Sequence, residues 1–205
     1  KLWSNFVALM DEREPATRLA MVRIALGVVL LCDLFWVEYY DLVTWLWGTT
    51  EQGGVGTASL WDMPPWSMRL LGEHTATVMF AVVALSAFTF TLGLFTRFSN
   101  FVLLIAYAQL AAIMPTSDRG IDMIFRATLV ILLFSRCGKT LSLDARRRTG
   151  AFVDESAAPA WPRHLIVLQL VWVYFTAGVH KTQSAWWPAG ELSALWRVLH
   201  DPHFA

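Results

Sequence analysis

The sequence has few charged residues and only two cysteines, and both shortages narrow what the protein can be. Asp, Glu, Lys and Arg make up 16% of the 205 residues, whereas about 25% is usual for a soluble domain. The acidic and basic residues balance to a formal net charge of zero, so overall charge does not predict binding to nucleic acid. Cys32 and Cys137 lie in an apolar run and in a basic loop. Two thiols in such places do not form the framework of a disulfide-stabilised fold.

Long apolar runs dominate what the sequence does contain. Hydrophobic residues make up 56% of the chain, with 11 Trp and 13 Phe among the aromatic residues, and the mean hydropathy is +0.48. A helix that crosses a bilayer needs about 20 mostly apolar residues, and five windows meet or approach that requirement. The sequence therefore predicts an all-α, polytopic transmembrane helix bundle with about five spans. The windows are residues 17–37, 75–96, 98–114, 121–135 and 163–179.

The segments outside these windows are amphipathic or rich in tryptophan. Residues 1–15 and 186–204 mix aromatic and charged side chains, which is typical of helices that lie in the membrane interface. Residues 38–73 form a long connection, whereas residues 94–97 are so short a link that the second and third spans should form a tight helical hairpin. Because the sequence does not begin with methionine, we expect residues 1–205 to be a single transmembrane domain, the ordered part of a longer chain.

The basic residues are divided unevenly between the two sides of the predicted bundle. Cytoplasmic loops of membrane proteins carry an excess of Lys and Arg, and the five windows divide the basic residues outside the spans ten to four. This count predicts a cytoplasmic N-terminus, with the connection 38–73 and the end of the fifth span outside. The expected location is the bacterial inner (plasma) membrane. The cytoplasmic side carries Lys1, Arg13, Arg18, Arg97, Arg136, Lys139, Arg146, Arg147, Arg148 and Arg163, and the outer side carries Arg69, Arg119, Lys181 and Arg197.

Besides Arg18 and Arg163 at the edges of their windows, four charged residues fall inside the predicted spans, where a charge is costly and marks a functional site by default. Arg23 and Asp33 stand ten residues apart on the first span, about 15 Å of helical rise, so each needs its own partner. Asp122 and Arg126 are spaced i, i+4 on the fourth span and can pair with each other. We treat the four as an intramembrane polar network. A purely structural role is an alternative for Asp122 and Arg126, and Arg23 can instead extend its guanidinium to the interface.

The end of the fifth span, residues 174–181, is the segment richest in reactive side chains. On a helix Tyr174, Gly178 and Lys181 share one face at i, i+4, i+7, and the glycine leaves space beside the lysine stem. Desolvation at the edge of the hydrocarbon favours a neutral amine, which can act as a base. The alternative is that Lys181 only ends the span and reaches for water. His180 faces another direction and is then a structural interfacial residue.

Other kinds of site are not indicated. The 5 histidines are scattered along the chain and lack the spacing of a metal cluster, so no metal site is predicted. The glycine-rich residues 53–56 lack the spacing of a phosphate loop. The spans show no inverted repeat, which disfavours a transporter.

Three motifs, in a fixed order along the chain, together resemble a known family. Residues 174–181 read YFTAGVHK and are followed by WWPAGEL at residues 186–192. Residues 19–27 place an arginine inside the opening span, and residues 141–145, LSLDA, follow the fourth span. In this order the motifs resemble the HTTM (horizontally transferred transmembrane) domain family, which is related to the vitamin K-dependent gamma-carboxylase.

The resemblance implies a chemical role for the end of the fifth span. Lys181 matches the lysine that acts in the carboxylase as an amine base on vitamin K hydroquinone, and His180 falls where the animal enzyme has another lysine. In the carboxylase the deprotonated quinol reacts with oxygen to give a strong base, which removes a glutamate γ-proton before CO2 adds. The catalytic candidates are therefore Lys181 and His180, and the implied cofactor is a quinol such as vitamin K hydroquinone. The substrate-binding candidates are Tyr174, Gly178, Trp186, Trp187 and Gly190.

Two features differ from the carboxylase and give two functional hypotheses. Residues 117–122 contain no histidine where the carboxylase has a working one, and the chain ends before a large extramembrane portion. We therefore expect base chemistry on a quinol or other lipid-soluble substrate, with Asp122 and Arg126 as polar lining, rather than full carboxylation. The alternative is a non-catalytic transmembrane subunit or scaffold of a larger membrane complex. Expected partners are membrane lipids and, in the alternative, other membrane-protein subunits, but not nucleic acid.

Overall fold

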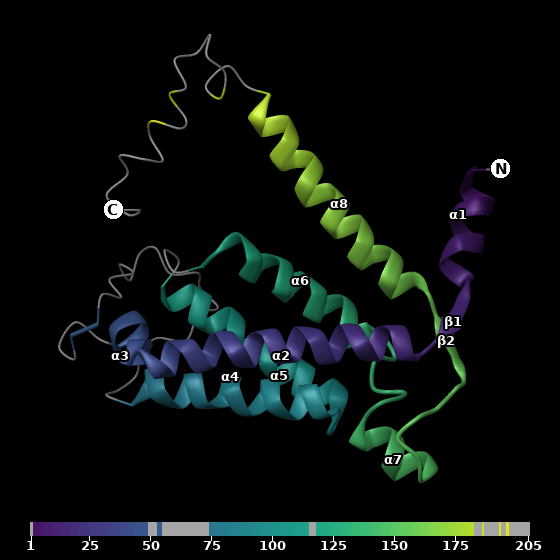
Figure 1. The fold of residues 1–205 in the computed structure, drawn as a ribbon, viewed down its shortest axis with the longest axis horizontal. Helices are drawn as coiled ribbons and strands as arrows, with labels where there is room; N and C mark the ends of the chain where they lie inside the picture. Colours follow the sequence, from purple (N-terminus) through teal and green to yellow (C-terminus); the bar gives the residue numbers. More distant parts are fainter. Residues whose placement is uncertain are drawn as a thin grey trace. The chain divides into compact units, whose positions relative to one another are not determined.

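In the computed structural model, most of the described residues are helical (Figure 1), in line with the all-α prediction. The chain divides into two compact units, Lys1–His164 and Leu165–Ala205, and each is described by itself. Most of the expected amphipathic helix at 186–204 and most of the connection 38–73 lie outside the described residues. The structure describes residues 2–48, 53–54, 74–114, 118–182, 186, 193 and 196.

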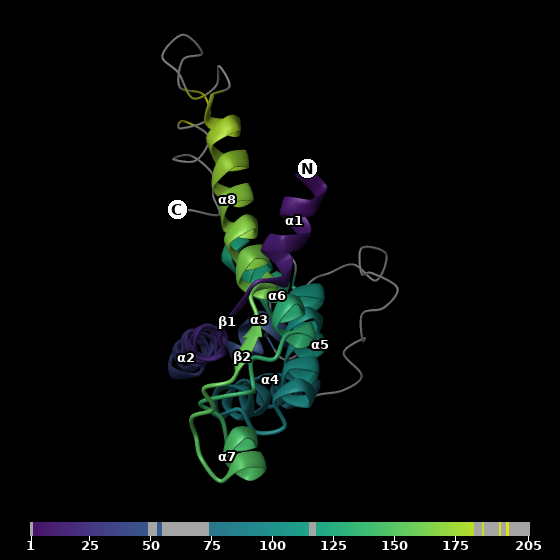
Figure 2. The ribbon, with the colours of Figure 1, turned by 90° about the vertical axis from the view of Figure 1, so that its right-hand side faces the viewer.

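The first unit is built on a layer of long helices. α4 packs against both α2 and α5, and Figure 2 looks along the axis of α2. α6 packs against α5, and α8 (Trp161–Lys181) begins in the first unit and continues through the second. The other helices are α1 (Leu2–Asp11), α2 (Thr17–Tyr39), α3 (Leu42–Trp47), α4 (Thr75–Leu92), α5 (Thr96–Ile113), α6 (Gly120–Phe134) and α7 (Leu143–Thr149).

Three of the described helices, α2, α4 and α5, are long and apolar enough to cross a membrane. The prediction of about five spans is therefore met for three of its windows. α6 has 15 residues, about 22 Å of rise, which is shorter than a hydrocarbon core of about 30 Å. α8 is long enough at 21 residues, but its sequence is more polar, with His164 and Gln169 among its residues. Five spans stay a prediction.

α2 and α4 pack closely because α2 has a glycine at their contact. The buried residues of α2 recur every three or four positions, the spacing of one helical face. Gly27 lies within this buried face, and a Cβ added to it would lie 2.0 Å from the Thr91 hydroxyl oxygen of α4. A glycine at such a contact lets two membrane helices approach closely. The buried residues are Leu19, Ala20, Arg23, Leu26, Gly27, Leu30 and Leu34.

α4 and α5 form the tight hairpin that the sequence predicts. α4 ends at Gly93, whose φ of 68° lies in the left-handed region that favours glycine. Its backbone N–H donates to the Phe90 carbonyl over 3.0 Å. Phe95 also has a left-handed φ, 46°, which is uncommon for a bulky residue. The sharp reversal between Gly93 and Phe95 turns α5 back along α4.

A short strand pairing joins the first segment of the chain to the start of α8. β1 (Arg13–Pro15) pairs antiparallel with β2 (Ala157–Pro159), and three residues are too few to give a strand pattern in the sequence. Glu14 is buried here and accepts hydrogen bonds from Arg18 over 2.8 Å and from Arg163 over 2.7 Å. The paired charges hold the N-terminal segment against the first turn of α8.

Candidate functional site

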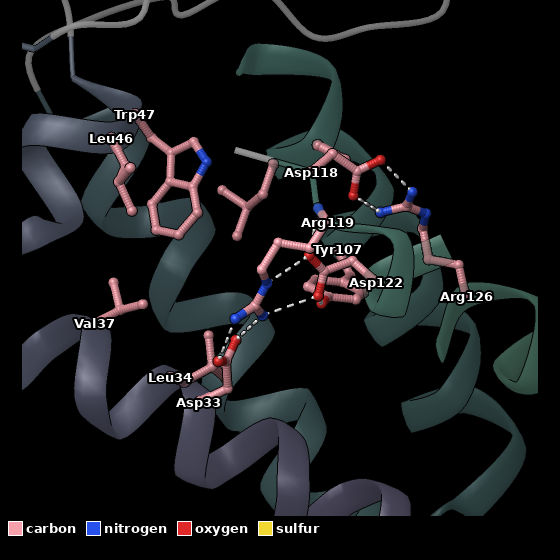
Figure 3. Close-up of a pocket in the computed structure, with 12 residues that line it drawn as sticks. Asp33, Leu34, Val37, Leu46, Trp47, Tyr107, Asp118, Arg119, Asp122 and Arg126 are labelled. Atoms are coloured by element: carbon pink, nitrogen blue, oxygen red, sulfur yellow. Dashed lines mark hydrogen bonds and ion pairs between the residues drawn. The ribbon is translucent and has the colours of Figure 1, made fainter. Parts of the chain in front are cut away.

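Two charged residues of α2, Arg23 and Asp33, make contacts toward opposite ends of the helix. Near its beginning Arg23 contacts the connection between α6 and α7, and near its end Asp33 contacts Arg119, just before α6. The Asp33 end contains a cavity of about 230 Å³ between α2, α3, α5 and α6, here called the Arg119 cavity (Figure 3). Its wall is part apolar and part charged, as in many small-molecule sites. The lining residues are Asp33, Leu34, Val37, Leu46, Trp47, Tyr107, Leu110, Ala111, Asp118, Arg119, Asp122 and Arg126.

Arg119 joins α2 to α6 through two carboxylates. Its Nη2 lies 2.7 Å from Asp33 Oδ2, and its Nε lies 3.0 Å from Asp122 Oδ2 (Figure 3). Its backbone N–H also donates to Asp122 over 2.8 Å, which caps the start of α6. The hydrogen bonds to Asp122 and then to Asp33 raise the pKa of Arg119 above its usual range. The cavity therefore holds a guanidinium that stays charged and shares its charge with both carboxylates.

Tyr107 brings α5 into the same network. Its hydroxyl donates to Asp122 Oδ1 over 2.6 Å, a short hydrogen bond of the charge-assisted kind. The Asp122 side chain is only 7% exposed, so it needs these donors in place of water. Three helices, α2, α5 and α6, thus meet at one buried carboxylate.

The predicted direct pair between Asp122 and Arg126 is wrong. Arg126 instead binds Asp118 through two hydrogen bonds of 2.8 and 2.6 Å. The reason is that Arg119 and Tyr107 already occupy both oxygens of Asp122, while Asp118, just before the helix, offers a planar pair of oxygens to the guanidinium. Arg126 also lies over the Tyr107 ring, 5.8 Å from its centroid. Asp33, Asp122 and Arg126 therefore line one cavity, joined by residues that lie outside the predicted network.

Trp47 contributes a donor that the protein does not use. Its indole lies in the apolar part of the Arg119 cavity (Figure 3) and is 8% exposed. The buried Nε1–H has no hydrogen-bond partner among the residues that the structure describes. A buried N–H without a partner costs about 1–3 kcal/mol. A ligand oxygen in the cavity would remove that cost.

Arg23 belongs to a separate arrangement at the other end of α2. It is 0% exposed, so its guanidinium is held by the protein rather than by water. Its guanidinium donates to the carbonyl oxygen of Cys137 over 2.9 Å and to that of Leu141. Gly93 leaves room for it, because a Cβ there would lie 2.9 Å from Nη1. Arg23 fastens the connection between α6 and α7 to α2.

The LSLDA motif holds the α4–α5 hairpin to the same connection. Ser142 caps the start of α7 with its side-chain oxygen. Asp144 accepts hydrogen bonds from the backbone N–H groups of Phe95, over 2.9 Å, and Thr96, over 2.7 Å. Burial alone raises the pKa of Asp144, but these bonds, the Thr96 hydroxyl and the Arg147 charge hold it below its usual range. In this chain the motif has a structural role.

The predicted base and its neighbours lie on α8. Tyr174, Gly178, His180 and Lys181 all fall within its last two turns or so, so the first, second and last of these share the helix face that the spacing predicts. In this second unit a Cβ added to Gly178 would meet nothing within 4 Å. Of the other substrate-binding candidates, Trp186 is among the described residues but its neighbours in the sequence are not, and Trp187 and Gly190 lie outside the described residues.

Sequence reasoning missed four residues that shape the Arg119 cavity: Trp47, Tyr107, Asp118 and Arg119. A signal was available for two of them, because Asp118 and Arg119 directly precede a predicted span whose own charges lacked partners. Trp47 and Tyr107 gave no such signal, since aromatic residues recur throughout the chain. Within the described part of the chain, no group of three or more His, Cys, Asp or Glu could hold a metal ion.

Comparison with known proteins assigns the chain to a family. The model of the HTTM domain matches residues 12–203. Searches among curated proteins and among solved structures give no match. The matched range includes the Arg119 cavity, the Arg23 contacts and α8, and three helices within it can cross a membrane. The chain therefore belongs to the HTTM domain family, membrane proteins related to the vitamin K-dependent gamma-carboxylase.

Proposed function

We propose one role for each unit: the Arg119 cavity of the first unit binds the polar ring of a quinol or related lipid-soluble substrate, and Lys181 of the second unit acts as a base on such a substrate. The observation that carries the proposal is the unpaired indole N–H of Trp47 in the cavity wall. A ring oxygen would accept its hydrogen bond, while Leu34 and Val37 of α2 contact the ring itself. The small cavity, about 230 Å³, suits one ring, with the apolar tail of the substrate left in the bilayer.

The proposed chemical step is a single proton transfer. The neutral amine of Lys181 takes the hydroxyl proton of the quinol, which leaves a quinolate and an ammonium. His180, the residue before Lys181, offers a second basic nitrogen. Lys181 falls on the outer side in the predicted topology.

An anaerobic binding experiment tests the two roles separately. A short-chain naphthoquinol is titrated into the protein in lipid nanodiscs, and quinolate absorption reports proton removal. Lys181→Ala should bind the quinol but abolish the quinolate signal. Lys181→Arg should do the same, because a guanidinium keeps its proton. Thr182→Ala is the control and should behave as the parent protein. A full quinolate signal in Lys181→Ala would refute the base.

The binding role has its own variant. Trp47→Phe keeps the aromatic packing and removes only the N–H donor. We expect quinol binding about 5- to 30-fold weaker, the worth of about 1–2 kcal/mol for one buried hydrogen bond. Unchanged affinity in Trp47→Phe would place the substrate outside the Arg119 cavity, whatever Lys181 does.

One observation favours the alternative, a non-catalytic subunit or scaffold. Each guanidinium that lines the cavity already has a carboxylate partner: Arg119 pairs with Asp33 and Asp122, and Arg126 pairs with Asp118. Such a network is satisfied without a ligand, as expected if its sole role is to fix helix packing. In that case the protein purified in mild detergent carries stoichiometric partners, and no quinol binds. Purification of the protein alone, with quinol binding intact, contradicts the scaffold.

We also infer five spans, an inner-membrane location and a cytoplasmic N-terminus. The inference rests on the basic residues that gather at the hairpin and at the α6–α7 connection, whereas Arg119 lies at the other end of α2. In a variant with Cys32 and Cys137 replaced by serine, a membrane-impermeant maleimide added to intact cells should label Thr182→Cys and leave Thr149→Cys unlabelled. The reverse pattern would invert the topology.

A further inference from the structure

A second cavity, larger and basic, lies at the end of the first unit where Arg23 is found. It has a volume of about 600 Å³ and forms where the α4–α5 hairpin meets the α6–α7 connection. One carboxylate, Asp144, also lines it, but that group is occupied by hydrogen bonds from Phe95 and Thr96. The basic residues of the wall are Arg97, Arg136, Lys139 and Arg148.

Two of these four cations are already engaged within the protein. Lys139 Nζ donates to the Ala157 carbonyl over 2.7 Å, and Arg148 pairs with Asp154 over 3.0 Å. Arg97 and Arg136 are exposed, and within the described ranges neither forms an ion pair. The cavity thus presents two guanidinium groups with donors to spare. Guanidinium matches the geometry of a phosphate group and binds it through paired hydrogen bonds.

An apolar groove adjoins this basic cavity. The groove, of about 250 Å³, runs between α4 and α5 and shares Phe95 and Phe98 with the cavity. Both helices are long and apolar enough to cross a membrane, so the groove opens toward hydrocarbon. Phe95 and Phe98 are 60% and 69% exposed. The other residues that line the groove are Val82, Leu85, Ser86, Thr89, Leu94, Ser99 and Val102.

We propose that the basic cavity and the groove together bind one glycerophospholipid with an anionic headgroup. Its phosphate lies between Arg97 and Arg136, and one acyl chain follows the groove past Phe98. Charge at one end and apolar surface at the other match the two parts of such a lipid, and basic pockets between membrane helices bind anionic headgroups elsewhere. A zwitterionic lipid fits less well, because its ammonium faces the same cations. This lipid site is separate from the Arg119 cavity and does not depend on quinol binding.

Native mass spectrometry of the purified protein tests the proposal. Dioleoyl phosphatidylglycerol should bind at one site more tightly than dioleoyl phosphatidylcholine, which has the same chains. Arg97→Gln/Arg136→Gln should weaken phosphatidylglycerol binding about tenfold or more, since each basic residue contributes about 1 kcal/mol. Phosphatidylcholine binding should fall less, because the loss of its phosphate contacts is partly offset by relief of its ammonium group from the two cations. Arg13→Gln/Arg146→Gln removes two exposed cations of the first unit outside the cavity and should retain binding.

Further arms separate the headgroup from the chains. Inorganic phosphate at the same concentration should not displace the lipid, because it lacks the chain that occupies the groove. Phe98→Ala should weaken both lipids, since it removes the wall shared by groove and cavity. Equal affinity for the two lipids, an equal loss in the control pair, or displacement by inorganic phosphate would each overturn the proposal. The wild-type comparison of the two lipids does not depend on how any variant folds.

Discussion

Replacement of Arg23 by leucine should destabilise the protein, although it makes α2 more apolar. The guanidinium is fully buried and donates to the carbonyl oxygens of Cys137 and Leu141. Arg23→Leu leaves both carbonyls without that donor, at about 1–3 kcal/mol for each buried group. Part of this is returned, because the cost of burying a charge disappears. We expect a net loss of about 2–5 kcal/mol in the free energy of unfolding.

The sign of the effect separates two explanations of this arginine. If Arg23 were only a tolerated charge, leucine would favour the membrane by up to about 3 kcal/mol on insertion scales, and the variant would be more stable. Arg23→Lys keeps the charge but replaces the planar fork by a single ammonium, so it should lose roughly half as much stability as Arg23→Leu.

Equilibrium unfolding in mixed micelles, followed by helical circular dichroism, measures the difference. Arg13→Leu is the matched control, because Arg13 is exposed on β1, and it should change the unfolding free energy by less than about 0.5 kcal/mol. An Arg23→Leu variant as stable as the parent, or more stable, would refute the structural role of the Arg23 contacts.

Three further predictions address packing, pH and thiol access. Gly27→Ala should cost about 1–3 kcal/mol of unfolding free energy, because the added Cβ overlaps a side chain of α4. Gly120→Ala is the control and should be nearly neutral, because its Cβ meets nothing within 4 Å. Equal effects of the two variants on unfolding in micelles would contradict this packing. The folded-state pKa of Asp144 is lowered, so its contribution to the free energy of unfolding is present above the unfolded pKa of about 3.9 and is lost as the pH falls through the folded value. Between about pH 5 and pH 3 the parent protein should therefore lose more stability than Asp144→Asn. Parallel pH profiles of the two proteins would contradict the hydrogen bonds to Asp144. Burial raises the pKa of the Cys137 thiol, so in a Cys32→Ser background maleimide should label Cys137 only as fast as the protein unfolds, and rapid labelling of the folded protein would contradict its burial.

The sequence predicted the helices well because their signal is local. Apolar runs mark α2, α4 and α5 without reference to the rest of the chain, and the short link at residues 94–97 predicted the hairpin of α4 and α5. The β1–β2 pairing could not be predicted, because each strand has three residues and its partner lies far away in sequence.

The charged residues show where sequence reasoning fails. Spacing on one helix suggested that Asp122 pairs with Arg126, yet Asp122 binds Arg119 and Tyr107 instead. An i, i+4 pair contributes only about 0.2–0.5 kcal/mol on an exposed helix, so better partners from outside the helix displace it. Partners on other elements depend on the tertiary arrangement, which one helix does not encode. For the same reason no sequence pattern predicted that Arg23 binds backbone carbonyl groups of another segment.

The central claim, that the Arg119 cavity receives the ring of a lipid-soluble substrate, can be tested by photoaffinity labelling. An azido-naphthoquinone is irradiated with the protein in nanodiscs, and the modified peptides are identified by mass spectrometry. We predict labels on the cavity-lining parts of α2, α3 and α5, at residues 33–37, 46–47 and 107–111, that excess unlabelled quinone suppresses. Labels confined to other helices, or labels in the cavity that unlabelled quinone does not reduce, would contradict the claim.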